Sequence, residues 1–383
     1  MSSYEIKTIT VLGAGDMGHG IAEVALMSGY KVYLYDINDD CVGKGAKRIF
    51  ESLEKLVKKG KVASDLYENI KDELLVVTTD LDESVKETDL VIEAIPEVMD
   101  LKKETFARID KTAPKHALFA SNTSTMSISE IASSTDRPDR FFGLHYFNPA
   151  VIMKLVEVIQ GDLTSEKTIK AGMDFVVRNN KVPVHVRKDV PGFIVNRVQG
   201  PAAVLLNCIL DQNIAEPEEV DAVMRSLGVP MGPYEVLDFT GLDVNYYANS
   251  YFAEAIHKDF AMGKTLKEKF DKGELGKKTG KGIFDWSDGR PEIDLSKTTD
   301  AFDPMDLIAV NANEAGKIVE LGVCNFEDVD TAIKNATGNK AGLIALIKNI
   351  SPEDLCARLE GLSKRFDKEI FKPCRLISEG SYI

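Results

Sequence analysis

Three glycines near the amino terminus have the spacing of a phosphate-binding turn. They form a GxGxxG pattern that follows the apolar run 9–12 and opens a helix-like stretch near 17–25. In this setting the first glycine permits a tight turn, the second lets the backbone approach a pyrophosphate, and the third lets the helix pack on the strand. The phosphates would lie at the positive end of that helix. The pattern predicts a dinucleotide site with contacts from Gly13, Gly15, Asp16, Met17 and Gly18.

An acidic residue follows at the expected distance. Asp36 ends the run KVYLYD, 18 residues after the last glycine of the turn. A carboxylate there can accept hydrogen bonds from ribose hydroxyls and would repel a 2′-phosphate, which favours NAD over NADP. The alternative is that Asp36 only caps the end of a strand.

A histidine and a glutamate form a second candidate pair. His145 ends the apolar run 141–145, and Glu157 lies inside the apolar run 155–159. A carboxylate in such a run is costly to bury unless it is paired, and a protonated imidazole is a suitable partner. The pair could act as a general base, because imidazole accepts a proton near neutral pH and a carboxylate behind it fixes its tautomer. Spacing alone leaves an equal alternative, in which His145 is a core histidine and Glu157 faces water.

These residues need a scaffold, and the first half of the chain predicts one. Short apolar runs alternate there with long, charged, helix-like stretches. Such alternation indicates βαβ units and a parallel sheet covered on both faces, with ligands at the carboxyl ends of the strands. We predict an α/β Rossmann domain over residues 1–189, with strands at 9–12, 31–35, 74–78, 89–95, 117–121, 141–145 and 155–159.

The second half predicts helices and a repeat. Helical patterns run over 195–212 and 217–227, whereas 288–306 is polar and turn-rich, as in a linker. The landmarks Glu219-Val220-Asp221 and Gly232 recur at Asp328-Val329-Asp330 and Gly342, 109 and 110 residues later. We expect an all-α domain at 190–287 and its second copy at 307–383.

Several segments together carry a family resemblance. They are SNTS at 121–124, GLHYFNP at 143–149, KLVEVI at 154–159 and PGFIVNR at 191–197. In this order they resemble the 3-hydroxyacyl-CoA dehydrogenase family, and 230–233, 238–243 and 277–282 continue the match. The resemblance covers about residues 5–287, and the tail from about 307 is similar to the extra C-terminal domain of some archaeal and multifunctional members.

The resemblance implies catalytic roles. His145 would take the proton of the 3-hydroxyl group while C3 of the substrate delivers a hydride to the nicotinamide, and Glu157 would orient His145. Ser124 and Asn196 would hydrogen-bond the substrate oxygens; the alternative for these two is a turn cap and a helix-start cap.

The resemblance also implies ligand contacts. Asn148 would lie near the cofactor, Glu97 on its ribose side, and Lys102 would be a further cofactor contact. Pro96, beside Glu97, departs from the more usual family pattern. A basic cluster over 44–61 would receive the CoA phosphates, with Lys55, Lys58 and Lys59 as candidates; the alternative is a solvated helix face.

Composition narrows the class of protein. The net charge of −14 argues against nucleic-acid and anionic-membrane partners. Five cysteines without CxxC spacing fit neither a zinc site nor a disulfide framework, and they suit a reducing cytosol. The sequence contains no apolar run of about 18 residues, so it predicts no membrane span. We expect a cytoplasmic enzyme without a metal.

The resemblance thus implies NAD-dependent oxidation of (S)-3-hydroxyacyl-CoA, with 3-hydroxybutyryl-CoA as the expected substrate. Two alternatives stay open: a dehydrogenase of a free hydroxy acid or sugar acid, and a non-catalytic NAD-binding protein. The chain is expected to be a monomer or a homodimer.

Overall fold

The structure is a computed structural model that describes residues 4–338 and 341–383. Two compact units make up the chain. The first contains Met1–Ile194 and Gly322–Gly342, and the second contains Val195–Leu321 and Leu343–Ile383. The domain boundaries predicted at residues 189, 287 and 307 refer to parts of the chain that would fold independently. They remain predictions.

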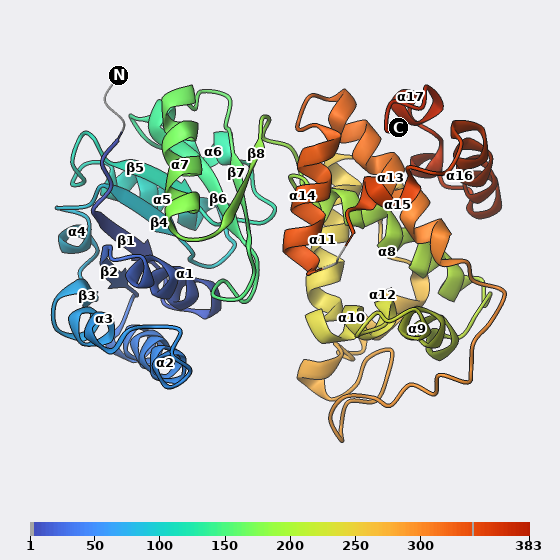
Figure 1. The fold of residues 1–383 in the computed structure, drawn as a ribbon, viewed down its shortest axis with the longest axis horizontal. Helices are drawn as coiled ribbons and strands as arrows, with labels where there is room; N and C mark the ends of the chain where they lie inside the picture. The colour runs from blue at the N-terminus through green and yellow to red at the C-terminus, as the bar shows by residue number, and fades with distance from the viewer. Residues whose placement is uncertain (1–3, 339–340) are drawn as a thin grey trace. The chain divides into compact units, whose positions relative to one another are not determined.

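An eight-stranded sheet forms the centre of the first unit (Figure 1). Its order is β3-β2-β1-β4-β5-β6-β7-β8, and every neighbouring pair from β3 to β6 is parallel. The order 3-2-1-4-5-6 is that of a Rossmann fold, which confirms the predicted class. The strands are β1 (Thr8–Leu12), β2 (Lys31–Tyr35), β3 (Leu75–Thr78), β4 (Leu90–Glu93), β5 (Leu118–Ser121), β6 (Phe141–Tyr146), β7 (Leu155–Ile159) and β8 (Val182–Val186).

The strand β7 departs from the predicted parallel arrangement. It runs antiparallel to β6, and β8 is parallel to β7. The reason is the connection: residues 147–154 contain no helix, and a parallel return needs a crossover of about a dozen residues or more. The short loop therefore turns the chain straight back along β6.

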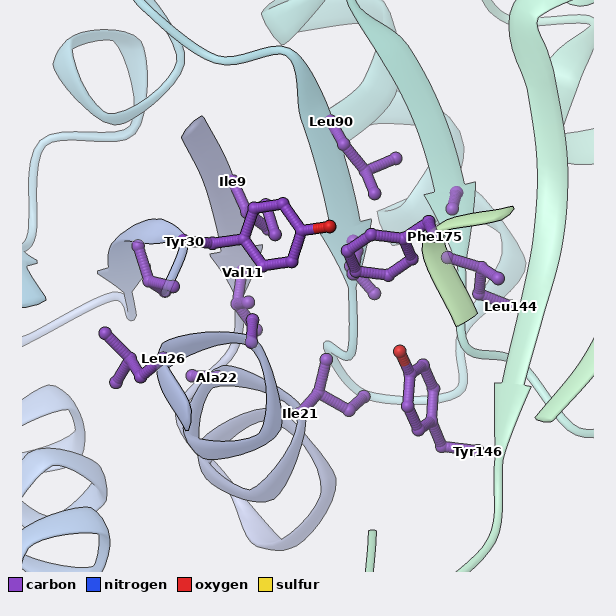
Figure 2. Close-up of a cluster of buried hydrophobic side chains, with 14 of the residues drawn as sticks. Ile9, Val11, Ile21, Ala22, Leu26, Tyr30, Leu90, Leu144, Tyr146 and Phe175 are labelled. Atoms are coloured by element: carbon purple, nitrogen blue, oxygen red, sulfur yellow. The ribbon is translucent and has the colours of Figure 1, made fainter. Parts of the chain in front are cut away.

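Helices cover both faces of this sheet. On one face, side chains of β1, β4 and β6 share a core with Ile21 and Leu26 of α1 and with Phe175 of α7 (Figure 2). On the other face, the ring of Phe106 in α5 contacts those of Phe119 and Phe141. The helices of the unit are α1 (Asp16–Met27), α2 (Asp39–Lys58), α3 (Ser64–Asn69), α4 (Leu81–Ser84), α5 (Met99–Ile109), α6 (Ile128–Ala132), α7 (Glu166–Arg178) and α14 (Phe326–Thr337).

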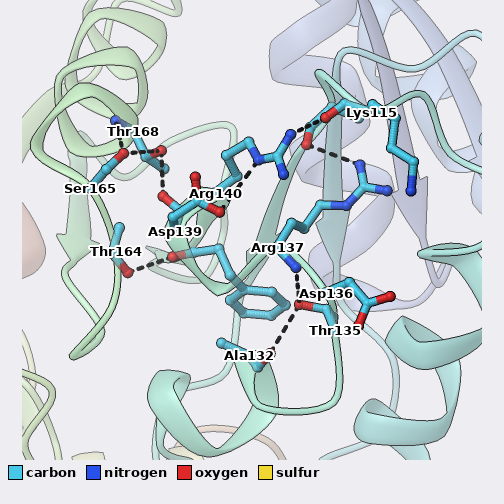
Figure 3. Close-up of polar contacts among 12 residues, drawn as sticks. Lys115, Ala132, Thr135, Asp136, Arg137, Asp139, Arg140, Thr164, Ser165 and Thr168 are labelled. Atoms are coloured by element: carbon cyan, nitrogen blue, oxygen red, sulfur yellow. Dashed lines mark hydrogen bonds and ion pairs between the residues drawn. The ribbon is translucent and has the colours of Figure 1, made fainter.

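Two arginines fasten the amino end of β6. Arg137 is 2% exposed, and its guanidinium donates to the carboxylate of Asp110 and to the carbonyl oxygens of Asp110 and Pro114. Arg140 donates to the carbonyl of Lys115 (Figure 3). These contacts satisfy backbone carbonyls at the end of the strand away from His145, so this cluster anchors the strand that carries the histidine.

Helices make up the second unit, and α13 packs against α8. The segment predicted as a linker has no helix or strand until α13 begins at Pro304. The helices are α8 (Val195–Asp211), α9 (Pro217–Ser226), α10 (Pro233–Thr240), α11 (Leu242–Ala255), α12 (Lys264–Asp271), α13 (Pro304–Glu320), α15 (Leu343–Ile347), α16 (Pro352–Phe366) and α17 (Arg375–Ser378).

The predicted repeat is visible in close contacts. A Cβ atom at Gly232 would lie 2.2 Å from Cγ of Asp221, and one at Gly342 would lie 2.2 Å from Cγ of Asp330. One hydrogen bond joins the copies at equivalent positions: the amide of Ala202 donates to Oδ1 of Asn311 at 3.1 Å. These two residues are 109 positions apart, which is the spacing of the repeat. Equivalent positions meet in this way where two copies are related by a two-fold axis.

A buried ion pair also joins the two copies within the second unit. Nε of Arg197, in the first turn of α8, lies 2.5 Å from Oε1 of Glu314 in α13, and the side chains are 8% and 1% exposed. Glu314 also accepts from Lys317 at 2.9 Å. The second copy thus holds the start of α8.

Candidate active site

The antiparallel pairing of β6 and β7 places the predicted catalytic pair together. Their register sets His145 directly opposite Glu157, and directly opposed residues lie on the same face of a sheet. Nδ1 of His145 is 2.6 Å from Oε2 of Glu157, and the side chains are 7% and 0% exposed. The alternative in which Glu157 faces water is therefore wrong. The contact at Nδ1 leaves Nε2 of the imidazole available for a substrate proton.

The surroundings fix both members of this pair. The amide of Ile194 donates to Oε1 of Glu157 at 3.1 Å. The rings of Phe147 and Phe193 lie 4.5 and 5.7 Å from the imidazole, centroid to centroid. The carboxylate is thus hydrogen-bonded at both oxygens, and two aromatic rings pack near the imidazole, which restricts the orientation of both groups.

Ser124 lies in the loop after β5, which Glu97 holds. One carboxylate oxygen of Glu97 accepts from the hydroxyl of Thr123, from the amide of Ser124 at 3.2 Å and from the hydroxyl of Thr125 at 3.2 Å. The hydroxyl of Ser124 is bonded to no described residue and is half-buried. Glu97, expected on the ribose side of the cofactor, therefore also fixes the loop that carries Ser124.

Lys102 is buried between two glutamates. It is 1% exposed, and its Nζ lies 2.6 Å from Oε1 of Glu93 and 3.1 Å from Oε2 of Glu97. Burial raises the pKa of Glu93 above its usual value, against the opposing effect of Lys102. Burial would also raise the pKa of Glu97, but the charge of Lys102 and the hydrogen bond from Thr123 outweigh it and lower the pKa. The ammonium of Lys102 thus lies between the buried carboxylate of Glu93 and the exposed carboxylate of Glu97 at this edge of the sheet.

Glu93 and Thr123 were not predicted as site residues. Glu93 is the last residue of β4, where it also accepts from the hydroxyl of Ser121 at 2.6 Å. A signal is present in the sequence, since an acid ends the apolar run LVIE just as Asp36 ends KVYLYD. Thr123 lies within the segment SNTS that carries the family resemblance, but its residue type alone is no signal, because threonines are frequent in loops.

The glycine turn fits a dinucleotide. Gly13 has φ +94°, and a Cβ atom there would lie 2.5 Å from the carbonyl oxygen of Ala94. A Cβ atom at Gly18 would lie 1.8 Å from the carbonyl oxygen of Gly13, whereas Gly15 is exposed and has no atom within 4 Å of that position. The close packing lies behind the turn and open space lies in front of it, at the amino end of α1, where a pyrophosphate would bind.

Three further predicted cofactor residues surround this turn. Asp36 accepts from the amide of Ala14 at 2.8 Å, so its carboxylate braces the turn from the end of β2. Asp16 is exposed and lies 2.6 Å from Arg48 of α2. Met17 is half-buried against the core.

Asn148 and Asn196 lie in different units. Asn148 is exposed in the loop between β6 and β7. Asn196 is half-buried in the first turn of α8. The convergence of Asn196 with His145 stays a prediction.

The basic cluster of α2 divides into two parts. Lys44, Lys47 and Arg48 lie within 4.0 Å of the carboxylates of Asp40, Glu51 and Asp16. In contrast, the candidates for CoA binding are exposed and form no ion pair with any described carboxylate; they are Lys55, Lys58 and Lys59. The uncompensated positive charge is therefore at the carboxyl end of α2.

The described residues contain no group of three or more His, Cys, Asp or Glu side chains placed to hold a metal ion. Among the helices in residues 4–338 and 341–383, none combines the length and apolar character needed to cross a bilayer.

Comparison with known families covers most of the chain. Residues 8–190 match the NAD binding domain of 3-hydroxyacyl-CoA dehydrogenase, and its C-terminal domain matches at both 192–286 and 307–380. The chain belongs to the 3-hydroxyacyl-CoA dehydrogenase family. Membership confirms the predicted NAD-binding domain, the reaction class and the repeated helical domain.

Relatives in this family cover the chain to different extents. Mitochondrial hydroxyacyl-coenzyme A dehydrogenase of Rattus norvegicus is 42% identical over 287 residues, which are 73% of this chain and 91% of that protein. A probable 3-hydroxybutyryl-CoA dehydrogenase of Bacillus subtilis is 38% identical over 290 residues, 74% of this chain and 99% of that one. The crystal structure of 3-hydroxybutyryl-CoA dehydrogenase from Escherichia coli K12 has a TM-score of 0.91 at 28% identity and covers 98% of both chains. That match includes the repeated domain.

Proposed function

We propose that this chain oxidises short-chain (S)-3-hydroxyacyl-CoA esters, foremost 3-hydroxybutyryl-CoA, to 3-oxoacyl-CoA, with His145 as the general base. The observation that carries the proposal is the buried pair of His145 and Glu157, at the same edge of the sheet as the glycine turn. Two relatives named as 3-hydroxybutyryl-CoA dehydrogenases, one of which matches over nearly the whole chain, support the short acyl chain.

The geometry supports a division of labour. Nε2 of His145 accepts the proton of the 3-hydroxyl group, while the carboxylate of Glu157 holds the proton on Nδ1 and stabilises the resulting imidazolium. Bound NAD supplies the acceptor for the hydride that leaves C3. The alcohol thereby becomes a ketone, and His145 later releases its proton to water.

The other site residues bind and orient. Ser124 and Asn196 donate hydrogen bonds to substrate oxygens; the free hydroxyl of Ser124 supports its role. Asn148 and Glu97 contact the cofactor. Lys102 acts through Glu97, because its own ammonium is buried against two carboxylates.

The CoA phosphates bind the uncompensated lysines at the carboxyl end of α2. If Lys55, Lys58 and Lys59 are replaced together by Gln, we expect KM for the CoA ester to rise and to lose most of its dependence on salt concentration. An unchanged salt dependence would place the phosphates elsewhere.

Assembly and compartment complete the proposal. The contact of α8 with α13 within one chain supports a monomer, since it provides internally a contact that would otherwise need a second chain. All five cysteines are free, which supports a reducing compartment such as the cytoplasm. Light scattering tests the assembly against the chain mass of 42.2 kDa.

The deciding experiment is the oxidation of NADH with acetoacetyl-CoA, beside free acetoacetate and a series of longer 3-oxoacyl-CoA esters. We expect turnover only with the CoA esters and the highest kcat/KM with the shortest. Turnover of free acetoacetate at a similar rate would favour a hydroxy-acid dehydrogenase, and turnover of long chains alone would refute the proposed chain length.

A further inference from the structure

Lys181 is a buried lysine that lies between α7 and β8. It is 8% exposed, and its Nζ donates to the carbonyl oxygens of Ala150 at 2.5 Å, Met153 at 2.7 Å and Val151 at 3.2 Å. An ammonium group has three hydrogens to donate, so one short segment uses its full capacity. Lys181 forms no ion pair with a described carboxylate, which distinguishes it from Lys102.

The segment that Lys181 binds is the loop 147–154, which joins the two catalytic strands. The ring of Phe147 at its start lies 4.5 Å from the imidazole of His145, centroid to centroid, and Asn148 follows. Further along, Ala150 packs on α1: a Cβ atom added at Gly20 would lie 3.2 Å from that of Ala150. The loop therefore contacts both the general base and the helix that opens at the glycine turn.

Few backbone bonds hold the shape of this loop. The amides of Ile152 and Met153 both donate to the carbonyl of Pro149, at 2.9 and 3.0 Å, and this leaves the carbonyls of the turn pointing towards Lys181. Buried carbonyls without a donor are costly. Without the ammonium, the turn would have to open towards water.

Keeping a charge here is itself unfavourable. Burial, together with a smaller effect of the nearby charge of Lys154, lowers the pKa of Lys181 to about 8. A neutral residue would avoid that desolvation, but it could not donate three hydrogen bonds to a single turn. A charged lysine at position 181 thus lowers the stability of the fold somewhat, but it fixes the conformation of the loop 147–154.

We propose that Lys181 is a positioning residue, whose ammonium holds the loop 147–154 against α1 and thereby sets the affinity for NAD and the placement of Asn148. This inference rests on the proposed function for the role of Asn148. It concerns the loop rather than the chemical step, so Lys181 acts through the residues that it holds.

The test compares Lys181→Met with Lys181→Arg, which keeps the charge and several donors. Ile109→Ala is the matched destabilised control, because Ile109 is fully buried in α5 on the other face of the sheet. NADH affinity is measured by fluorescence titration, hydrogen exchange is measured for the amides of 150–154, and KM is measured for NADH and for acetoacetyl-CoA.

For Lys181→Met we expect a Kd for NADH raised about tenfold or more, faster exchange in the loop, and a much smaller change in KM for acetoacetyl-CoA. Lys181→Arg should restore most of the affinity. The inference is overturned if Lys181→Met binds NADH as tightly as the unmodified chain, or no more weakly than Ile109→Ala. Because NADH binding is measured directly, failure of the unmodified chain to reduce acetoacetyl-CoA would refute only the proposed function.

Discussion

Glu23 is a buried acid whose replacement should make the protein more stable. It lies in α1, is 1% exposed, and accepts a hydrogen bond from the hydroxyl of Ser52 in α2 at 2.6 Å. Burial raises the pKa of Glu23 to about 7, and the hydrogen bond from Ser52 opposes this only in part. Glu23→Gln keeps the shape and the acceptor for Ser52 while removing the charge.

The direction of the pH effect follows from proton binding. Because the pKa of Glu23 is higher in the folded chain, the folded state keeps a proton between about pH 4.5 and 7 that the unfolded chain loses. Its contribution to stability is therefore fully present below pH 4.5 and is lost as the pH rises through 7. The loss corresponds to about 3 kcal/mol above pH 7.

Thermal unfolding of both proteins at pH 5 and pH 8 measures this effect. We expect Glu23→Gln to unfold at a temperature higher by roughly 5–10 °C at pH 8, and by much less at pH 5. Glu51→Gln is the control, because Glu51 is an exposed glutamate of α2 and should show no such difference. An equal shift at both pH values, or no shift at pH 8, would refute the reasoning.

Three other substitutions test the site and its supports. His145→Gln should lower kcat by about 10²–10⁴ with NADH affinity retained, and near-normal turnover would remove His145 as the base. Lys102→Met leaves Glu93 buried without its cation and should lower the free energy of unfolding by about 3–5 kcal/mol, measured by denaturant titration; a loss of NADH affinity alone would instead indicate direct cofactor contact. Glu314→Ala leaves the guanidinium of Arg197 buried without its carboxylate partner and should lower the free energy of unfolding by a similar amount, about 3–5 kcal/mol. An unchanged free energy of unfolding would show that the pair contributes nothing to stability.

The Rossmann half was predictable because its signals are local. Glycine spacing, apolar runs and the acid at the end of β2 all lie within short stretches, and the structure has a strand or turn at each. The pairing of His145 with Glu157 needed one more fact, the antiparallel direction of β7. Only a hairpin centred on the loop 147–154 brings these two positions opposite each other, and apolar patterning carries no information on strand direction.

Contacts that depend on how side chains and backbone meet in the folded chain were not predictable. Lys102 was expected at the cofactor, but Glu93 and Glu97 receive its ammonium. Nothing in the residues around Lys181 marks it, because its partners are backbone carbonyls, which every residue has. The repeat was readable from its glycines and acids, yet the contact of Arg197 with Glu314 depends on how the copies meet.

Because the two helical copies belong to one polypeptide, the contact between them does not have to be symmetric. With the repeat spacing of 109, the counterpart of Glu314 is Leu205 and that of Arg197 is Asp306, so this ion pair exists once. It braces the turn of α8 that contains Asn196. In an assembly of identical chains each substitution at such a contact appears twice, and a residue useful on one side must be tolerated on the other. Here a mutation changes one side alone, so the second copy is free to evolve as a dedicated support for the first.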